Sequence, residues 1–188
     1  MGRLVSPLHR MAAAAAVLLA MAGCTPSGSG NDGEGVSAPM QTGSVELVSV
    51  TVDQWREEIG KLRGEIVVTD MWATWCIPCI ERFPHMVELA RRYAKDGVRF
   101  VSTCLDDPGD EQAVTYARQF LQEQNATFAN YLIDDNIADS FEKLDLLTIP
   151  AVFIYGRDGE IRYRLTADDP NNQFTDRDVE EAIEELLG

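Results

Sequence analysis

Two cysteines separated by two residues are the part of the sequence best suited to chemistry. Cys76 and Cys79 enclose Ile77 and Pro78 where an apolar strand passes into a helix. A thiol at a helix start lies beside unpaired backbone N–H groups and the positive end of the helix dipole, which favour the thiolate. Cys79, one helical turn further on, is within reach to form a disulfide. The spacing therefore predicts thiol–disulfide exchange, with Cys76 as the nucleophile and Cys79 as the resolving thiol.

A carboxylic acid precedes the cysteine pair inside an apolar stretch. Asp70 lies six residues before Cys76, within the apolar segment 65–72. A buried carboxylate is costly unless it is paired or functional, and burial should raise its pKa. A carboxyl of raised pKa can accept the proton of Cys79, directly or through a water. The alternative is that Asp70 faces solvent at the margin of a sheet, as single strand carboxylates usually do.

The elements that must position these residues alternate between strand and helix. Short apolar runs predict strands at residues 45–50, 65–72, 98–105, 129–133, 151–155 and 161–165. Helical spacing predicts helices at residues 51–62, 76–94, 112–124, 139–144 and 178–187. Asp158-Gly159 supplies the positive-φ turn of a hairpin, so the last two strands should be antiparallel. This order predicts an α/β fold with a central mixed sheet covered on both faces.

Individual residues should fix the ends and faces of these helices. Thr51 and Thr175 precede apolar runs as N-caps, and Pro84 should interrupt the helix over residues 76–94. In the helix over residues 112–124, one apolar face should contain Ala113, Tyr116, Ala117 and Phe120.

The cysteine pair lies within a longer run that resembles a known family. Residues 72–79 read WATWCIPC, Pro84 follows in the helix, and residues 148–150 read Thr-Ile-Pro before a strand. Together they resemble the thioredoxin superfamily, and most of all its membrane-tethered TlpA/ResA-like thiol–disulfide oxidoreductases. The resemblance implies a three-layer α/β/α fold with one extra α/β unit over about residues 106–133.

The resemblance also implies a binding surface around the cysteines. Pro150 would be the family's cis-proline, in a loop against the cysteine pair, and the residue before it would offer backbone hydrogen bonds to an extended substrate. Apolar side chains should form a docking rim, although Trp75 could equally pack inward. The rim residues are Trp75, Ile77, Pro78 and Ile149. The sequence departs from the family at Ala151, where threonine is common, and in residues 165–173, which lack a glycine often found there.

The direction of electron flow follows from the residues between the cysteines. Ile77 and Pro78 provide no cation to stabilise a thiolate, which favours a reducing couple. Together with the resemblance, this predicts reduction of protein disulfides outside the cytoplasm, with apocytochrome c as one implied client and a membrane thiol electron donor as a second partner. The alternatives are a disulfide oxidase or isomerase, and a non-catalytic thioredoxin-like binding module.

The same residues also have purely structural, non-catalytic interpretations. The pair could be a permanently closed structural disulfide or half of a zinc site, but Cys104 and His85 show no paired spacing for zinc. Cys104 is expected to be a small buried apolar residue, and His85 a surface imidazole rather than a base. We expect a monomer without metal, and with no cofactor beyond the redox-active Cys76–Cys79 disulfide.

The N-terminus has the pattern of a secretion signal. Residues 1–23 carry two arginines, no acid and an apolar stretch, and end in Met-Ala-Gly before Cys24. This resembles the lipobox of bacterial lipoproteins, which implies lipidation of Cys24; a plain signal cleaved elsewhere is the alternative. Residues 24–43 are rich in Gly, Ser and Pro and should form a flexible tether. The folded domain is therefore expected at residues 44–188, anchored by lipid on the extracytoplasmic face of a membrane.

Length and charge limit the remaining classes. The 188 residues suit one domain, and 45% hydrophobic residues indicate a globular protein. Removing residues 1–23 would leave 14 of the 16 basic residues against 31 acidic ones, so the charge of −15 would become −17. Such an acidic chain has no evident means of binding nucleic acid. No apolar run has the roughly 18 residues of a membrane-spanning helix.

Overall fold

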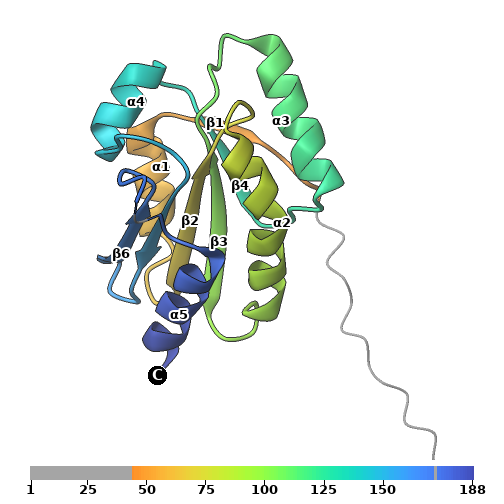
Figure 1. The fold of residues 1–188 in the computed structure, drawn as a ribbon. Helices are drawn as coiled ribbons and strands as arrows, with labels where there is room; N and C mark the ends of the chain where they lie inside the picture. The colour runs from red at the N-terminus through yellow and green to blue at the C-terminus, as the bar shows by residue number, and fades with distance from the viewer. Residues whose placement is uncertain (1–43, 172) are drawn as a thin grey trace, which may run out of the picture. The chain divides into compact units, whose positions relative to one another are not determined.

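A six-stranded mixed sheet forms the centre of this computed structural model, which describes residues 44–171 and 173–188 (Figure 1). The strand order is β1-β4-β3-β2-β5-β6. Neighbouring strands from β1 to β2 are parallel, whereas β5 is antiparallel to both β2 and β6. The strands are β1 Val48–Val50, β2 Ile66–Trp72, β3 Val98–Cys104, β4 Ala129–Ile133, β5 Ala151–Tyr155 and β6 Ile161–Thr166. The predicted mixed sheet and its antiparallel hairpin are confirmed.

Helices cover both faces of this sheet (Figure 1). They are α1 Val52–Gly60, α2 Ile77–Arg92, α3 Glu111–Glu123, α4 Ile137–Leu144 and α5 Asp176–Leu187. The connections β2-α2-β3 and β3-α3-β4 advance in the same direction across the sheet, so right-handed crossovers place α2 and α3 on one face. Helix α5 packs against α2, and α1 packs against α4 on the other face. The three-layer α/β/α fold and the extra unit, α3 with β4, are as predicted.

Alternating residues of β2 explain how one strand serves both layers. Val67 and Met71 belong to a buried cluster that includes Trp55 of α1. Ile66 and Val68 belong to a second buried cluster, which includes residues of α5. Successive side chains of a strand point to opposite faces, so a strand buried on both faces is apolar throughout. All seven residues of β2 are buried, and a carboxylate in this strand is therefore surrounded by protein.

The predicted N-caps of the first and last helices are confirmed. Thr51 exchanges hydrogen bonds with Gln54, and Thr175 does so with Asp178, so each helix begins with a complete capping box. The cap at Thr175 starts α5 at Asp176, two residues before the start predicted from its apolar pattern. This difference brings Asp176 into the first helical turn.

The single helix predicted over residues 76–94 is confirmed, and Pro84 does not divide it into two. Helix α2 continues from Ile77 to Arg92 with Pro84 inside it. A proline removes one hydrogen bond and displaces one carbonyl, which bends a helix without having to end it when both flanks remain packed. Phe83 and Val87, on either side of Pro84, are both buried.

The predicted apolar face of α3 is partly wrong. Ala117 and Phe120 are buried as expected, but Tyr116 is 49% exposed and the face turns toward Val114 and Leu121 instead. Phe120 packs with Trp72 of β2, their ring centroids being 5.3 Å apart. The long amphipathic ring of Tyr116 can remain at the surface, where its hydroxyl stays hydrated.

The N-terminal predictions fall outside the described residues. The signal peptide at residues 1–23, lipidation of Cys24 and the tether at residues 24–43 all precede residue 44. None of the helices in the described part of the chain has the length and apolar character needed to cross a membrane.

Phe120 and Tyr116 allow a matched test of this packing. Phe120→Ala should lower the free energy of unfolding by about 3–5 kcal/mol, because it opens a cavity beside Trp72. Tyr116→Ala, four residues earlier on the exposed side of α3, should change it by no more than about 0.5 kcal/mol. Urea unfolding monitored by tryptophan fluorescence measures both, and equal losses would contradict the observed face of α3.

Candidate active site

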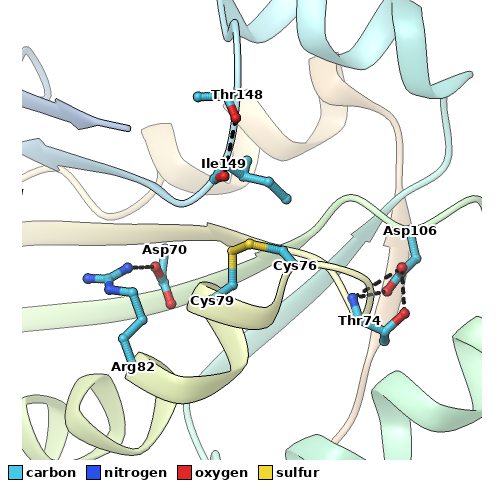
Figure 2. Close-up of a disulfide and its surroundings, with 8 residues drawn as sticks. All are labelled: Asp70, Thr74, Cys76, Cys79, Arg82, Asp106, Thr148 and Ile149. Carbon is cyan, nitrogen blue, oxygen red and sulfur yellow. Dashed lines mark hydrogen bonds and ion pairs between the residues drawn. A yellow bond between two sulfur atoms is a disulfide. The ribbon is translucent and has the colours of Figure 1, made fainter. Parts of the chain in front are cut away.

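The two cysteines predicted to be reactive form a disulfide at the start of α2 (Figure 2). Cys76 is the N-cap residue and Cys79 lies in the first turn, with their Sγ atoms 2.05 Å apart. The first turn contains no acidic side chain, so nothing in it offsets the positive end of the helix dipole at Cys76. Both residues are largely covered, with 5% of Cys76 and 1% of Cys79 exposed.

Apolar side chains surround the disulfide at the surface. Trp75 is 56% exposed and Ile77 is 69% exposed, so Trp75 does not pack inward. Pro78 is also exposed, whereas Ile149 is buried. Figure 2 shows Ile149 beside the disulfide, in the loop that follows α4. The structure thus gathers all four predicted rim residues around the cysteines.

The loop before β5 contains a cis peptide bond and a strongly exposed leucine. The Ile149–Pro150 peptide bond is cis, as the resemblance implied. Leu147, which the sequence interpretation passed over, is 84% exposed in the same loop. Leu147 lies three residues before Pro150, and this short distance in the sequence could have drawn attention to it.

Asp70 lies next to the disulfide on the side of Cys79 (Figure 2). It occupies the middle of β2 and only 3% of it is exposed, so the alternative of an aspartate facing solvent is wrong. Its Oδ1 accepts a hydrogen bond from Nη1 of Arg82 at 2.6 Å. Oδ2 is buried and receives no hydrogen bond from any described residue. One oxygen is therefore held in place and the other remains available as an acceptor.

Burial and the ion pair with Arg82 shift the pKa of Asp70 in opposite directions. Burial raises the pKa of Asp70 from its ordinary value of 3.8 to about 6, although the Arg82 guanidinium acts to lower it. The prediction of a raised pKa is thus confirmed in direction. The sequence analysis missed Arg82. Arg82 lies three residues after Cys79, which places both side chains on one face of the helix. That spacing was an available signal.

A second carboxylate holds the loop before Cys76. Asp106 is buried and accepts hydrogen bonds from Thr74, with its Oδ2 3.0 Å from the backbone nitrogen and its Oδ1 2.8 Å from Oγ1. Trp72 of β2 pairs with Cys104 of β3, so the two residues that follow each strand lie level at the same sheet edge. Figure 2 shows Asp106 and Thr74 on the side of Cys76 away from Asp70. Sequence reasoning missed Asp106 because this pairing depends on strand register.

The third cysteine of the domain contributes to the same loop. Cys104 is fully buried and its thiol donates a hydrogen bond to Oδ2 of Asp106 at 3.1 Å. Burial, and then the Asp106 carboxylate, raise the pKa of Cys104 well above its ordinary value. The thiol therefore stays protonated, which fits the predicted structural role and not a redox role.

The other residues considered as ligands lie elsewhere. His85 has 28% of its side chain exposed, and its Nδ1 is 3.8 Å from a carboxylate oxygen of Glu88. Among residues 44–171 and 173–188, no three His, Cys, Asp or Glu side chains are grouped as a metal site requires.

Comparisons with known proteins agree with this geometry. Residues 44–164 match the sequence profile of the AhpC/TSA family. The thiol-disulfide oxidoreductase ResA of Oceanobacillus iheyensis is 38% identical over 84 residues, which are 45% of this chain and 41% of ResA. The thiol:disulfide interchange protein DsbE of Vibrio cholerae is 30% identical over 132 residues, covering 65% of this chain and 66% of DsbE. Both matches thus span less than two thirds of the relative.

A solved structure extends the similarity to three dimensions. A Chlorobium tepidum protein assigned as the thiol:disulfide interchange protein DsbE superimposes with a TM-score of 0.56 at 25% identity. The superposition covers 69% of this chain and 85% of that protein. The arrangement of sheet and helices described above is therefore that of thioredoxin-like proteins.

Removing the Asp106 carboxylate should loosen the loop before Cys76. Asp106→Ala leaves the Thr74 N–H without its acceptor, and we expect a loss of about 1–3 kcal/mol in the free energy of unfolding. Hydrogen exchange at the Thr74 amide should also become faster. The control is Asp107→Ala at the exposed neighbouring position, which should leave that amide unchanged. Unaltered exchange at Thr74 in Asp106→Ala would contradict this role.

Proposed function

Because the chain belongs to the AhpC/TSA family of thioredoxin-like proteins, we propose that its folded domain is a thiol–disulfide oxidoreductase acting through Cys76 and Cys79. The observation that carries the proposal is the disulfide between the N-cap and the first turn of α2, set in an exposed apolar surface. The names of the relatives, a thiol-disulfide oxidoreductase and a thiol:disulfide interchange protein, support the same activity.

The proposed reaction transfers two electrons from the reduced cysteines to a client disulfide. The Cys76 thiolate attacks one client sulfur, and the other client sulfur leaves as a thiolate and is protonated from solvent. Cys79 then gives its thiol proton to Asp70 and attacks Sγ of Cys76. This step forms the Cys76–Cys79 disulfide, breaks the mixed disulfide and releases the second client thiolate. Asp70 acts as the general base, for which its unpaired Oδ2 is suited.

The proposed partner at this site is an extended segment of a disulfide-bearing protein. Trp75, Ile77 and Pro78 offer it an exposed apolar surface next to the cysteines, and the loop with Ile149 and Pro150 borders the disulfide (Figure 2). Extended segments bind to such edges through backbone hydrogen bonds, while apolar contacts bury their side chains. The resemblance makes apocytochrome c one such client.

Reduction of the client is the direction that the local charges favour. Ile77 and Pro78 bring no cation to Cys76, and the buried carboxylate of Asp106 lies on the Cys76 side of the disulfide (Figure 2). Negative charge nearby opposes the thiolate and so makes the dithiol a stronger reductant. A reductase needs a source of electrons, and we propose a thiol electron donor in the membrane. An oxidase or isomerase would be expected to stabilise the thiolate more strongly.

We further propose that the domain works at the outer face of a membrane. Residues 1–23 would be a removed signal, Cys24 the lipidated residue, and residues 24–43 the tether. Anchoring would raise the effective concentration of the domain near a membrane donor. The domain would work as a monomer, with the cysteine pair as its redox group and no bound metal.

Trapping of clients tests the proposed activity. Replacing the resolving thiol, Cys79→Ser, should leave Cys76 joined to client proteins by mixed disulfides that non-reducing gels and mass spectrometry reveal. Cys76→Ser is the matched control and should trap none, because Cys79 is the more deeply buried thiol. A folded Cys79→Ser variant that traps no more than this control would favour the non-catalytic binding module.

Equilibration with glutathione tests the direction. We expect a reduction potential well below about −180 mV, the value typical of isomerases, because neither residue between the cysteines, Ile77 or Pro78, supplies a cation to stabilise the Cys76 thiolate. The fraction of Cys76–Cys79 disulfide at defined glutathione ratios gives this potential. A value of about −120 mV would instead indicate an oxidase.

A further inference from the structure

Arg82 is a buried cation in the interior of the domain. Only 10% of its side chain is exposed, where it projects from α2 between β2 and the start of α5. Nη1 lies 2.6 Å from Oδ1 of Asp70, and Nε lies 3.3 Å from a carboxylate oxygen of Asp176. Arginines this buried are normally paired, and here a single guanidinium serves two acids.

Apolar contacts fix the guanidinium between these two acids. Nη2 lies 3.4 Å from the sulfur of Met86, one turn further along α2. The plane also faces the ring of Phe174, with Cζ 4.8 Å from the ring centroid. Phe174 directly precedes the N-cap of α5, so the same short segment supplies both the ring and Asp176. Arg82 therefore has little freedom to leave Asp70.

The orientation of Asp70 follows from this pairing. Because Arg82 binds Oδ1, the buried Oδ2 is left without a hydrogen bond from any described residue. Figure 2 shows Asp70 between Arg82 on one side and Cys79 on the other. An acceptor that is desolvated, fixed and unpaired beside a thiol is arranged to take a proton.

We propose that Arg82 is the positioning residue of the resolving step. It anchors Asp70 through Oδ1 and leaves Oδ2 free to accept the Cys79 proton. It also shares its charge with Asp176, so the start of α5 influences how readily Oδ2 accepts that proton. This inference rests on the proposed function of Cys79 and adds two residues to it. Arg82 does not take part in the proton transfer itself, because its guanidinium group stays protonated in proteins. The proton moves from Sγ of Cys79 to Oδ2 of Asp70 as Cys79 attacks Sγ of Cys76.

The charges that face Asp70 make the two partners act in opposite directions. Burial is the largest influence and raises the pKa of Asp70 to about 6; Arg82 lowers it, and Asp176 raises it. At the same level of the sheet, Asp70 is flanked by Ser102 of β3 and Val152 of β5, which carry no charge. Loss of Arg82 should thus raise the pKa of Asp70, and loss of the Asp176 charge should lower it.

An NMR titration of the Asp70 side-chain carboxyl in the oxidised protein measures this without requiring activity. Arg82→Met should move the titration midpoint upward by about 1–3 pH units, since it removes an adjacent opposite charge. Arg82→Lys keeps the charge and should stay close to the wild type. Asp176→Asn, at a position with 38% of its side chain exposed, should move the midpoint downward. Arg177→Met, at the neighbouring exposed arginine, is the control and should leave it unchanged.

The pH dependence of single-turnover reduction links the titration to the chemistry. Below the Asp70 midpoint the acceptor is already protonated, so the rate of Cys79 attack should fall as pH decreases. This limb should follow the midpoint upward in Arg82→Met and downward in Asp176→Asn. Should the wild type exchange no thiols at any pH, the proposed function is wrong. A different outcome would leave the function intact but show that the proposed role of Arg82 is wrong. In that outcome the wild type exchanges thiols, but the acid limb of its rate profile or the Asp70 midpoint is unchanged by both substitutions, or shifts in the same direction in both.

Discussion

Keeping a carboxylate buried beside a disulfide is the constraint on which the active site depends. Asp70 lies in a strand covered on both faces, where an unpaired charge would be strongly disfavoured. The cost is offset only if a cation reaches it, and Arg82 does so from the inner face of α2. Arg82 in turn requires acids and apolar cover, which the start of α5 provides through Asp176 and Phe174. One buried charge thus links the central strand, the cysteine helix and the last helix.

The parallel pairing of β2 and β3 determines the other half of the site. Parallel strands end at the same edge of a sheet, so the loop before Cys76 meets the segment after Cys104. Asp106 uses this proximity to hold both donors of Thr74. The loop that presents Cys76 is therefore fixed by a side chain thirty-two positions away in the chain, and not by the cysteine helix alone.

Local patterns in the sequence predicted the features that depend on residues close together in the chain. The features that the sequence analysis missed depend on contacts between residues far apart in the chain. The capping threonines, the hairpin at Asp158-Gly159 and the cysteine pair at a helix start all concern contacts within a few residues. Arg82, by contrast, owes its burial to Asp176, which is far along the chain. The wrong face at Tyr116 has the same cause, because tertiary packing overrides local preference there.

The environments of the two sulfur atoms support a division of labour between them. Cys76 has strongly exposed neighbours on either side, Trp75 and Ile77, so a visiting disulfide meets this end of the pair first. Cys79 is the less exposed of the two, at 1% against 5% for Cys76, and the proton acceptor Asp70 lies on its side of the disulfide (Figure 2). Attack on a client requires access, whereas resolution requires only that the thiol lose its proton when the mixed disulfide is already in place. The order of the proposed steps therefore follows from where each sulfur lies.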